Sequence, residues 1–175
     1  ALAEELMVNR NIALAEYANA PIHISNISTQ KSVELIRQAK AKGLKITASV
    51  NAYNLALDEN ILRDFDSNYK LNPPLRTKSD IEALQKGLVD GTIDAIATDH
   101  APHALIDKEV EYDCACFGIV GLETALALSL KLVESKKLKI EDVISLLTWK
   151  PASIVGIKKG DLSVGADNVV CEQIS

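Results

Sequence analysis

Apolar residues recur at helical spacing in several long segments, and short apolar runs separate these segments. The helical spacing predicts helices at residues 1–19, 31–42, 79–89, 124–135, 140–149 and 152–157. Short runs of β-branched and other apolar residues predict strands at residues 21–29, 44–50, 93–98 and 162–170. Residues 55–66 have a mixed pattern that indicates a short helix.

Capping residues set the expected ends of the helices. Ser28 or Thr29 is expected to cap the second helix, because either hydroxyl can accept a hydrogen bond from a free N–H group. The run Ser79-Asp80-Ile81-Glu82 indicates a capping box for the third helix. Pro151 is expected to end the helix at residues 140–149, because proline has no N–H to donate.

Two segments lack a regular pattern. Residues 69–76 contain two adjacent prolines and are predicted to be extended and rigid. Residues 104–116 are acidic and long enough to form a lid over a site. The same composition fits a solvated loop equally well, so both interpretations stay open.

The alternation of strands and helices predicts an α/β fold with a parallel sheet. No dinucleotide-binding glycine fingerprint is present, which favours half of a (βα)8 barrel over a Rossmann domain. We expect residues 1–160 to form this half barrel with its C-terminal helices, and residues 161–175 to begin a C-terminal strand segment. The chain starts within a helix and without an initiator Met, so it is interpreted as a piece of a longer protein. A half barrel also has two open sheet edges that something must cover.

Composition narrows the classes of function. Of the 175 residues, 47% are hydrophobic and the net charge is −5, and no basic block is present, so nucleic-acid binding is not expected. No apolar run reaches the length of a membrane span. The odd number of cysteines fits a reducing, cytoplasmic compartment, and Cys114 and Cys116 are too close together for a zinc knuckle.

The strongest chemical signal is the segment at residues 93–103. A predicted buried strand ends in Thr98, Asp99 and His100, and His103 follows after Pro102. Ligands and catalytic groups gather at the carboxyl ends of parallel strands, so Asp99 is a candidate metal ligand or general base. The alternative is an Asp that caps a helix, with two surface histidines.

These residues resemble dihydroorotase, a member of the amidohydrolase superfamily, in its longer bacterial class. The resemblance covers essentially the whole chain and is carried by motifs that occur in the family's order. They are Asn72-Pro73-Pro74-Leu75-Arg76, Asp90-Gly91-Thr92-Ile93-Asp94, Thr98-Asp99-His100-Ala101-Pro102-His103, Phe117-Gly118 and Gly121-Leu122-Glu123-Thr124. The resemblance implies a TIM-type barrel of which this chain would supply strands five to eight and the start of the C-terminal return strand.

In this family a pair of zinc ions activates a hydroxide that attacks the cyclic amide of dihydroorotate. The resemblance implies that Asp99 ligates metal and shuttles the proton to the leaving nitrogen. It also implies that Asn72 and His103 hold the substrate, together with main-chain groups of Phe117 and Gly118. The family's His-x-His motif and bridging acid would lie before Ala1.

Two positions depart from the family pattern. The family places a zinc-ligating His where this chain has Asn26, and it has Pro-His-His-Leu where this chain has Ala52-Tyr53-Asn54-Leu55. Amide oxygens and a neutral phenol are poor zinc ligands beside imidazole. His23 is not expected to substitute for Asn26, because residues three apart on a strand point to opposite faces; it is interpreted as a hydrogen-bonded sheet histidine.

These departures leave several functions open. One is a dihydroorotase that is inactive or impaired, with zinc absent or partial, and this chain alone is expected to be inactive. Another is a non-catalytic, dihydroorotase-like subunit that supports aspartate transcarbamoylase assembly or binds an active homologue. A homo-oligomer and a dihydroorotate-like ligand are also implied. Hydrolysis of another cyclic amide, such as a hydantoin, is a third option.

Overall fold

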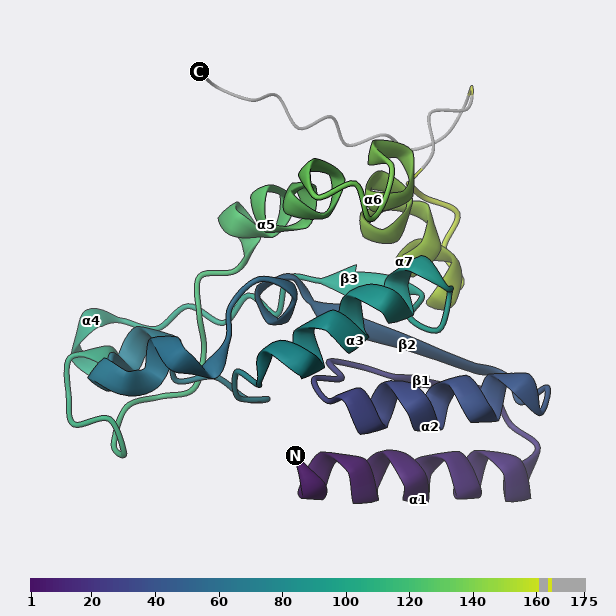
Figure 1. Cartoon of the computed structure of the whole chain (residues 1–175), viewed down its shortest axis with the longest axis horizontal. Coiled ribbons are helices and arrows are strands. Elements are labelled where there is room, and N and C mark those ends of the chain that lie inside the picture. Colours follow the sequence, from purple (N-terminus) through teal and green to yellow (C-terminus); the bar gives the residue numbers. More distant parts are fainter. Residues whose placement is uncertain (161–163, 165–175) are drawn as a thin grey trace.

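The computed structural model describes residues 1–160 and Val164. Three parallel strands form the sheet in the order β1 (Ile22–Ile24), β2 (Ile46–Asn51) and β3 (Ala95–Ala97) (Figure 1). The α-helices are α1 (Leu2–Ala18), α2 (Gln30–Ala41), α3 (Lys78–Val89), α4 (Leu105–Lys108), α5 (Leu122–Glu134), α6 (Ile140–Leu147) and α7 (Trp149–Ile154). Between β2 and α3 lie three short 3₁₀ turns, η1 (Ala52–Leu55), η2 (Glu59–Asp64) and η3 (Ser67–Tyr69).

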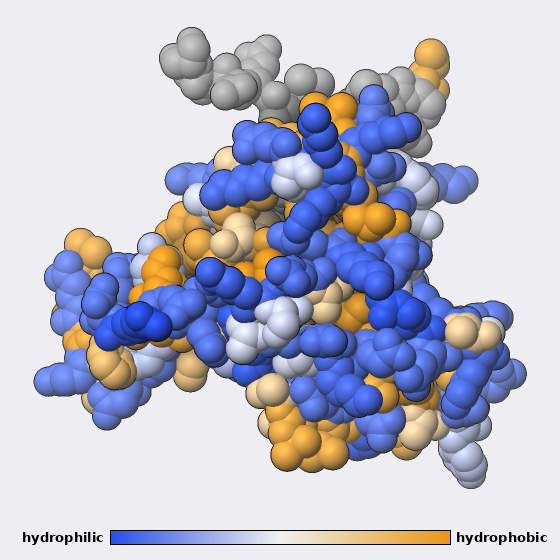
Figure 2. Space-filling model, viewed as in Figure 1, coloured by the Kyte–Doolittle hydropathy of each residue, from blue (hydrophilic) through white to orange (hydrophobic). Residues whose placement is uncertain are grey.

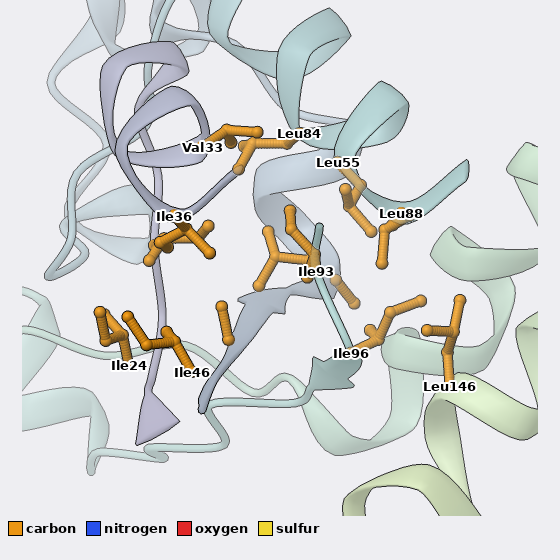
Figure 3. Packing of buried hydrophobic residues seen from close by; sticks show 14 of the residues in the cluster. Ile24, Val33, Ile36, Ile46, Leu55, Leu84, Leu88, Ile93, Ile96 and Leu146 are labelled. Carbon is orange, nitrogen blue, oxygen red and sulfur yellow. The ribbon is translucent and has the colours of Figure 1, made fainter. Parts of the chain in front are cut away.

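One face of the sheet carries the hydrophobic core. Ile24, Val50 and Ile96 point to this face and pack in one cluster with apolar residues of α2, α3 and α6 (Figure 3). Side chains alternate between the two faces of a strand, and register neighbours in parallel strands share a face. The other face therefore carries His23 beside Thr47 and, further along, Ser49 beside Ala95.

The strands predicted at 21–29, 44–50 and 93–98 are present in the structure, and each is shorter than predicted. β1 ends at Ile24, so the predicted strand at 21–29 gives way to a turn in which Asn26 has a left-handed backbone (φ 57°). A fourth parallel strand is reduced, within the described residues, to an isolated bridge between His100 and Ile119. The strand predicted at 162–170 lies outside the described residues.

The helix ends confirm one prediction and correct two. Thr29, one of the two predicted candidates, caps α2. Thr77 rather than Ser79 caps α3, because Asp80 at the third helical position closes a capping box with Thr77. Pro151 lies in the first turn of α7, where its missing N–H costs nothing, instead of ending a helix. The loop predicted at 104–116 contains the short helix α4.

Glu4 joins α1 to the start of α2. Its carboxylate accepts hydrogen bonds from the backbone N–H groups of Ser28 (2.8 Å) and Thr29 (3.1 Å) and from the Ser32 hydroxyl (2.7 Å). The Ser28 hydroxyl also donates to it, and Arg76 lies 3.4 Å away. A carboxylate here satisfies N–H groups that have no partner within the helix.

Glu4 is expected to make stability dependent on pH in the acid range. Burial alone would raise its pKa, but the hydrogen bonds from Ser28 and Ser32 and the charge of Arg76 outweigh burial, so the pKa is lowered from the ordinary 4.5. The stabilisation is therefore complete above pH 4.5 and is lost as pH falls through the lower, folded-state pKa.

The urea midpoint of the full-length protein, measured from pH 7 to pH 3, tests this expectation. Glu4→Gln should lower stability at pH 7 by about 1–3 kcal/mol, and the gap to the unsubstituted protein should narrow as pH falls below 4.5. A gap that stays constant over the whole range would contradict the assignment.

The surface carries scattered apolar groups on a hydrophilic background (Figure 2). One apolar patch lies beside the start of α1, where Leu2 and Leu6 are exposed. Within the described part of the chain, no helix is both long enough and apolar enough to cross a membrane.

Candidate functional site

Asp99 lies just beyond the carboxyl end of β3, where the sequence motif predicted it. Its backbone is left-handed (φ 47°), a conformation that costs energy for any residue other than glycine and that Asn and Asp tolerate best. This turn follows Ala97, the last residue of β3. Strained backbone of this kind persists only where surrounding contacts hold it.

Three side chains from other segments supply such contacts. Asn26 Nδ2 donates to Asp99 Oδ1 over 3.2 Å. Asn51 Nδ2 and the Tyr53 hydroxyl both donate to Asp99 Oδ2, over 3.1 Å and 2.5 Å. Asn51 Nδ2 also lies 2.8 Å from the Tyr53 oxygen. We call these four residues the Asp99 network; it joins the turn after β1, the end of β2 and the turn after β3.

Tyr53 acts in this network as a neutral donor. Its side chain is 1% exposed. Burial, followed by the hydrogen bond to Asp99 and the charge of that carboxylate, raises the pKa of Tyr53 far above its ordinary value. The phenol therefore stays protonated near neutral pH and holds its proton toward Asp99.

Two buried amide oxygens, at the end of β2 and in η1, have no hydrogen-bond partner in the part of the chain that the structure describes. Among the described residues, Asn51 Oδ1 and Asn54 Oδ1 are the buried side-chain atoms without a hydrogen-bond partner. Both residues are almost completely buried, at 0% and 2% exposed. A buried hydrogen-bond acceptor without a partner lowers the stability of the fold, so both oxygens would gain from a hydrogen-bond donor placed beside them.

The side chains around Asp99 are not a suitable set of ligands for a zinc ion. Zinc in proteins prefers imidazole, thiolate and carboxylate ligands. Here the single carboxylate already accepts three hydrogen bonds, and its neighbours are two amides and a protonated phenol. In the described part of the chain, no three His, Cys, Asp or Glu residues come close enough to share a metal ion. The described residues therefore do not by themselves form a zinc site.

The residues expected to hold substrate are only partly brought together. His103 and Gly118 line a pocket of about 250 Å³, with Tyr69, Lys108 and other residues, whereas Asn72 is exposed and is not part of its lining. His103 Nε2 lies 2.8 Å from the Phe117 carbonyl oxygen. The Phe117 ring is itself 57% exposed.

The Phe117 carbonyl and both main-chain groups of Gly118, which the family resemblance expects to hold substrate, make hydrogen bonds within the protein. The Gly118 N–H donates to the Lys70 carbonyl over 3.0 Å, and the Gly118 carbonyl accepts from Lys108 Nζ over 2.9 Å. Only glycine fits here, because φ is 150° and a Cβ would lie 2.3 Å from the Ala101 oxygen.

His23 is a sheet histidine, as predicted, but the reason given for separating it from Asn26 was wrong. Its ring nitrogens lie 2.9 Å from Thr47 Oγ1 and 3.2 Å from Ser49 Oγ. The Asn26 backbone N–H also reaches Ser49 Oγ, over 3.4 Å. The strand ends at Ile24, so alternation of faces does not extend to Asn26.

Asn51 is a site residue that sequence reasoning missed. It is the last residue of β2 and directly follows the strand predicted at 44–50, and a polar side chain at a strand's carboxyl end is a signal for a site. The family motif drew attention instead to Tyr53 and Asn54, the residues at the Pro-His-His-Leu position. Of these, Tyr53 contacts Asp99.

Comparisons with known proteins show the family of this chain. The sequence model described as "Amidohydrolase family" matches residues 1–171. A dihydroorotase from Geobacter sp. (strain M21) is 51% identical over 94% of this chain and 39% of its own length. A dihydroorotase from Thermoanaerobacter sp. (strain X514) is 52% identical over 97% of this chain and 40% of its own length.

A solved structure shows the same fold. The L-hydantoinase (dihydropyrimidinase) from Arthrobacter aurescens superposes with a TM-score of 0.86 at 29% identity, over 93% of this chain and 38% of that one. The α/β fold described above thus matches part of a TIM-type amidohydrolase barrel, and this chain spans about 39% of the length of the dihydroorotases that it matches. The chain belongs to the metal-dependent amidohydrolase family and is a homologue of dihydroorotases.

Proposed function

We propose that this chain is the part of a dihydroorotase-type barrel that contains strands five to eight, in a protein whose metal centre has been replaced by the Asp99 network. Residues 1–160 are the half barrel, and residues 161–175 begin the return strand. The protein is a non-catalytic or strongly impaired relative of the enzymes that interconvert dihydroorotate and carbamoyl aspartate, with zinc absent or partial.

One observation carries this proposal. The Asp99 carboxylate accepts hydrogen bonds from Asn26, where the family resemblance expects a zinc-ligating histidine, and from Tyr53, one of the two residues at the second such position. A metal-bound carboxylate directs its lone pairs at a cation, whereas this one receives N–H and O–H donors. Asn26 and Tyr53 therefore stabilise Asp99 together, because each donates a hydrogen bond to its carboxylate without a metal ion.

A non-catalytic homologue can still act through binding. We propose that the full-length protein assembles with aspartate transcarbamoylase, with an active homologue or with itself, and keeps a pocket for a dihydroorotate-like small molecule around His103. Asp99 and His103 are retained in this view for folding and binding rather than for turnover.

Turnover by the full-length protein, purified with zinc supplied, tests the proposal. We expect no hydrolysis of dihydroorotate above the rate without protein, because zinc-activated hydroxide needs ligands that this site lacks. Hydantoin serves as a second substrate, since the matching solved structure is a hydantoinase. Zinc-dependent turnover of dihydroorotate at a rate typical of enzymes, about 1–1,000 s⁻¹, would contradict the non-catalytic assignment, and turnover of hydantoin alone would replace the substrate class.

A further inference from the structure

Two lysines are buried beside the candidate ligand pocket. Lys70 and Lys108 are each 7% exposed, although lysine is almost never buried unless its charge is paired. Burying an ammonium group is costly, so each must find acceptors inside the protein. The acceptor atoms show which segments of the chain the two lysines hold in place.

Lys108 holds the turn that precedes α5. Its Nζ donates to the Cys116 carbonyl over 3.0 Å and to the Gly118 carbonyl over 2.9 Å. The Ser67 hydroxyl donates to the Lys108 carbonyl, which fixes the start of the acidic loop as well. Burial lowers the pKa of the Lys108 amine, which is consistent with an ammonium that depends on these carbonyls for its solvation.

Lys70 contacts the same turn through both its main chain and its side chain. Its carbonyl accepts the Gly118 N–H, and its Nζ donates to the Asp113 carbonyl over 2.8 Å. The same ammonium lies 4.7 Å from the centre of the Phe117 ring, within the range of a cation–π contact. Lys70 thus joins the loop at 104–116 to the segment before α3, and Lys108 joins it to the turn at residues 116–118.

The turn at residues 116–118 also holds His103. Residue 117 lies between the two carbonyls that Lys108 binds, and the Phe117 carbonyl is the partner of His103 Nε2 at 2.8 Å. With Nε2 engaged, Nδ1 is the ring nitrogen left for a ligand. His103, Lys108 and Gly118 all line the 250 Å³ pocket.

We infer that Lys108 is a positioning residue of this pocket, which fixes the turn at residues 116–118 and thereby the orientation of the His103 ring. This role concerns the shape of the binding pocket and holds whether or not the protein turns over a substrate. The buried ammonium would thereby help to present one nitrogen of the His103 ring to a ligand.

Hydrogen exchange and histidine NMR on the full-length protein test the inference. Lys108→Met removes the charge but keeps most of the side-chain volume. We expect peptides that contain residues 116–118 to exchange about tenfold faster, while peptides from β2 keep their exchange rates. The ring signal of His103 should shift, because its Phe117 partner is no longer fixed.

Two matched variants separate positioning from general stability. Lys108→Arg keeps a cation with several donors and should restore slow exchange and the His103 signal. Lys31→Met removes an exposed lysine charge from α2 and should change neither. If Lys108→Met does not fold, Ser67→Ala loosens the same loop more mildly and should show the same local pattern. Unchanged exchange at 116–118, or an equal increase throughout the sheet, would overturn the inference.

Discussion

Replacing Asp99 with asparagine is expected to lower the free energy of unfolding by about 3 kcal/mol. Asparagine tolerates the left-handed backbone at this position, so the change isolates the hydrogen bonds. One of the two carboxylate oxygens becomes an NH2 group, which faces donors from Asn26 or from Asn51 and Tyr53. The N–H and O–H groups that then face the new NH2 group lose their acceptor, and the negative charge that strengthened these hydrogen bonds is also lost.

Urea unfolding of the full-length protein, with and without EDTA, measures this effect. Asp64→Asn removes an exposed carboxylate from η2 and should change stability by less than about 0.5 kcal/mol. The loss at Asp99 should be the same with EDTA present, because the network needs no metal. A loss that appears only without EDTA would show that Asp99 stabilises the fold through a bound cation instead.

Restoring imidazoles at the two replaced positions is expected to raise zinc affinity. Asn26→His combined with Tyr53→His would place two imidazoles beside the Asp99 carboxylate, where the present side chains donate to it. Two histidines and a carboxylate are a ligand set that zinc accepts. The full-length double variant should hold roughly one zinc ion per chain more than the unsubstituted protein, measured by elemental analysis after gel filtration.

The choice of Tyr53 over Asn54 is itself testable. Asn26→His with Asn54→His is the matched variant, and it should gain less zinc because Tyr53, not Asn54, reaches Asp99. An equal gain in both double variants would show that position 54 can reach the site. No gain in either would show that the missing imidazoles are not what limits metal binding.

The position of Asp99 could be predicted from the sequence because the signal is local. A short apolar strand, followed by Thr98-Asp99-His100, places a carboxylate at a strand's carboxyl end without knowledge of the rest of the fold. Asn26 and Tyr53 could be singled out because they depart from a family motif at defined positions.

The contacts of Asp99 could not be predicted. Its partners lie 73 and 46 residues away for Asn26 and Tyr53, and their meeting depends on strand register and on the turn that β1 makes after Ile24. Asn51 was missed although its position at a strand's carboxyl end is a local signal; only its contact with Asp99, 48 residues away, depends on the tertiary fold. The roles of Lys70 and Lys108 were equally hidden, because lysines in an acidic loop region are normally exposed, and only tertiary packing buries these two.

The zinc content of the full-length, unsubstituted protein tests the central claim most directly. The protein would be purified without chelator, incubated with excess zinc, passed through gel filtration and analysed for metal and protein together. The Asp99 network predicts at most about one zinc ion per chain, because Asn26 and the pair Tyr53 and Asn54 stand where the family has zinc-ligating histidines and amide or phenol oxygens hold zinc weakly. A stable content of about two zinc ions per chain, as a two-metal site would hold, would contradict the replacement of the metal centre.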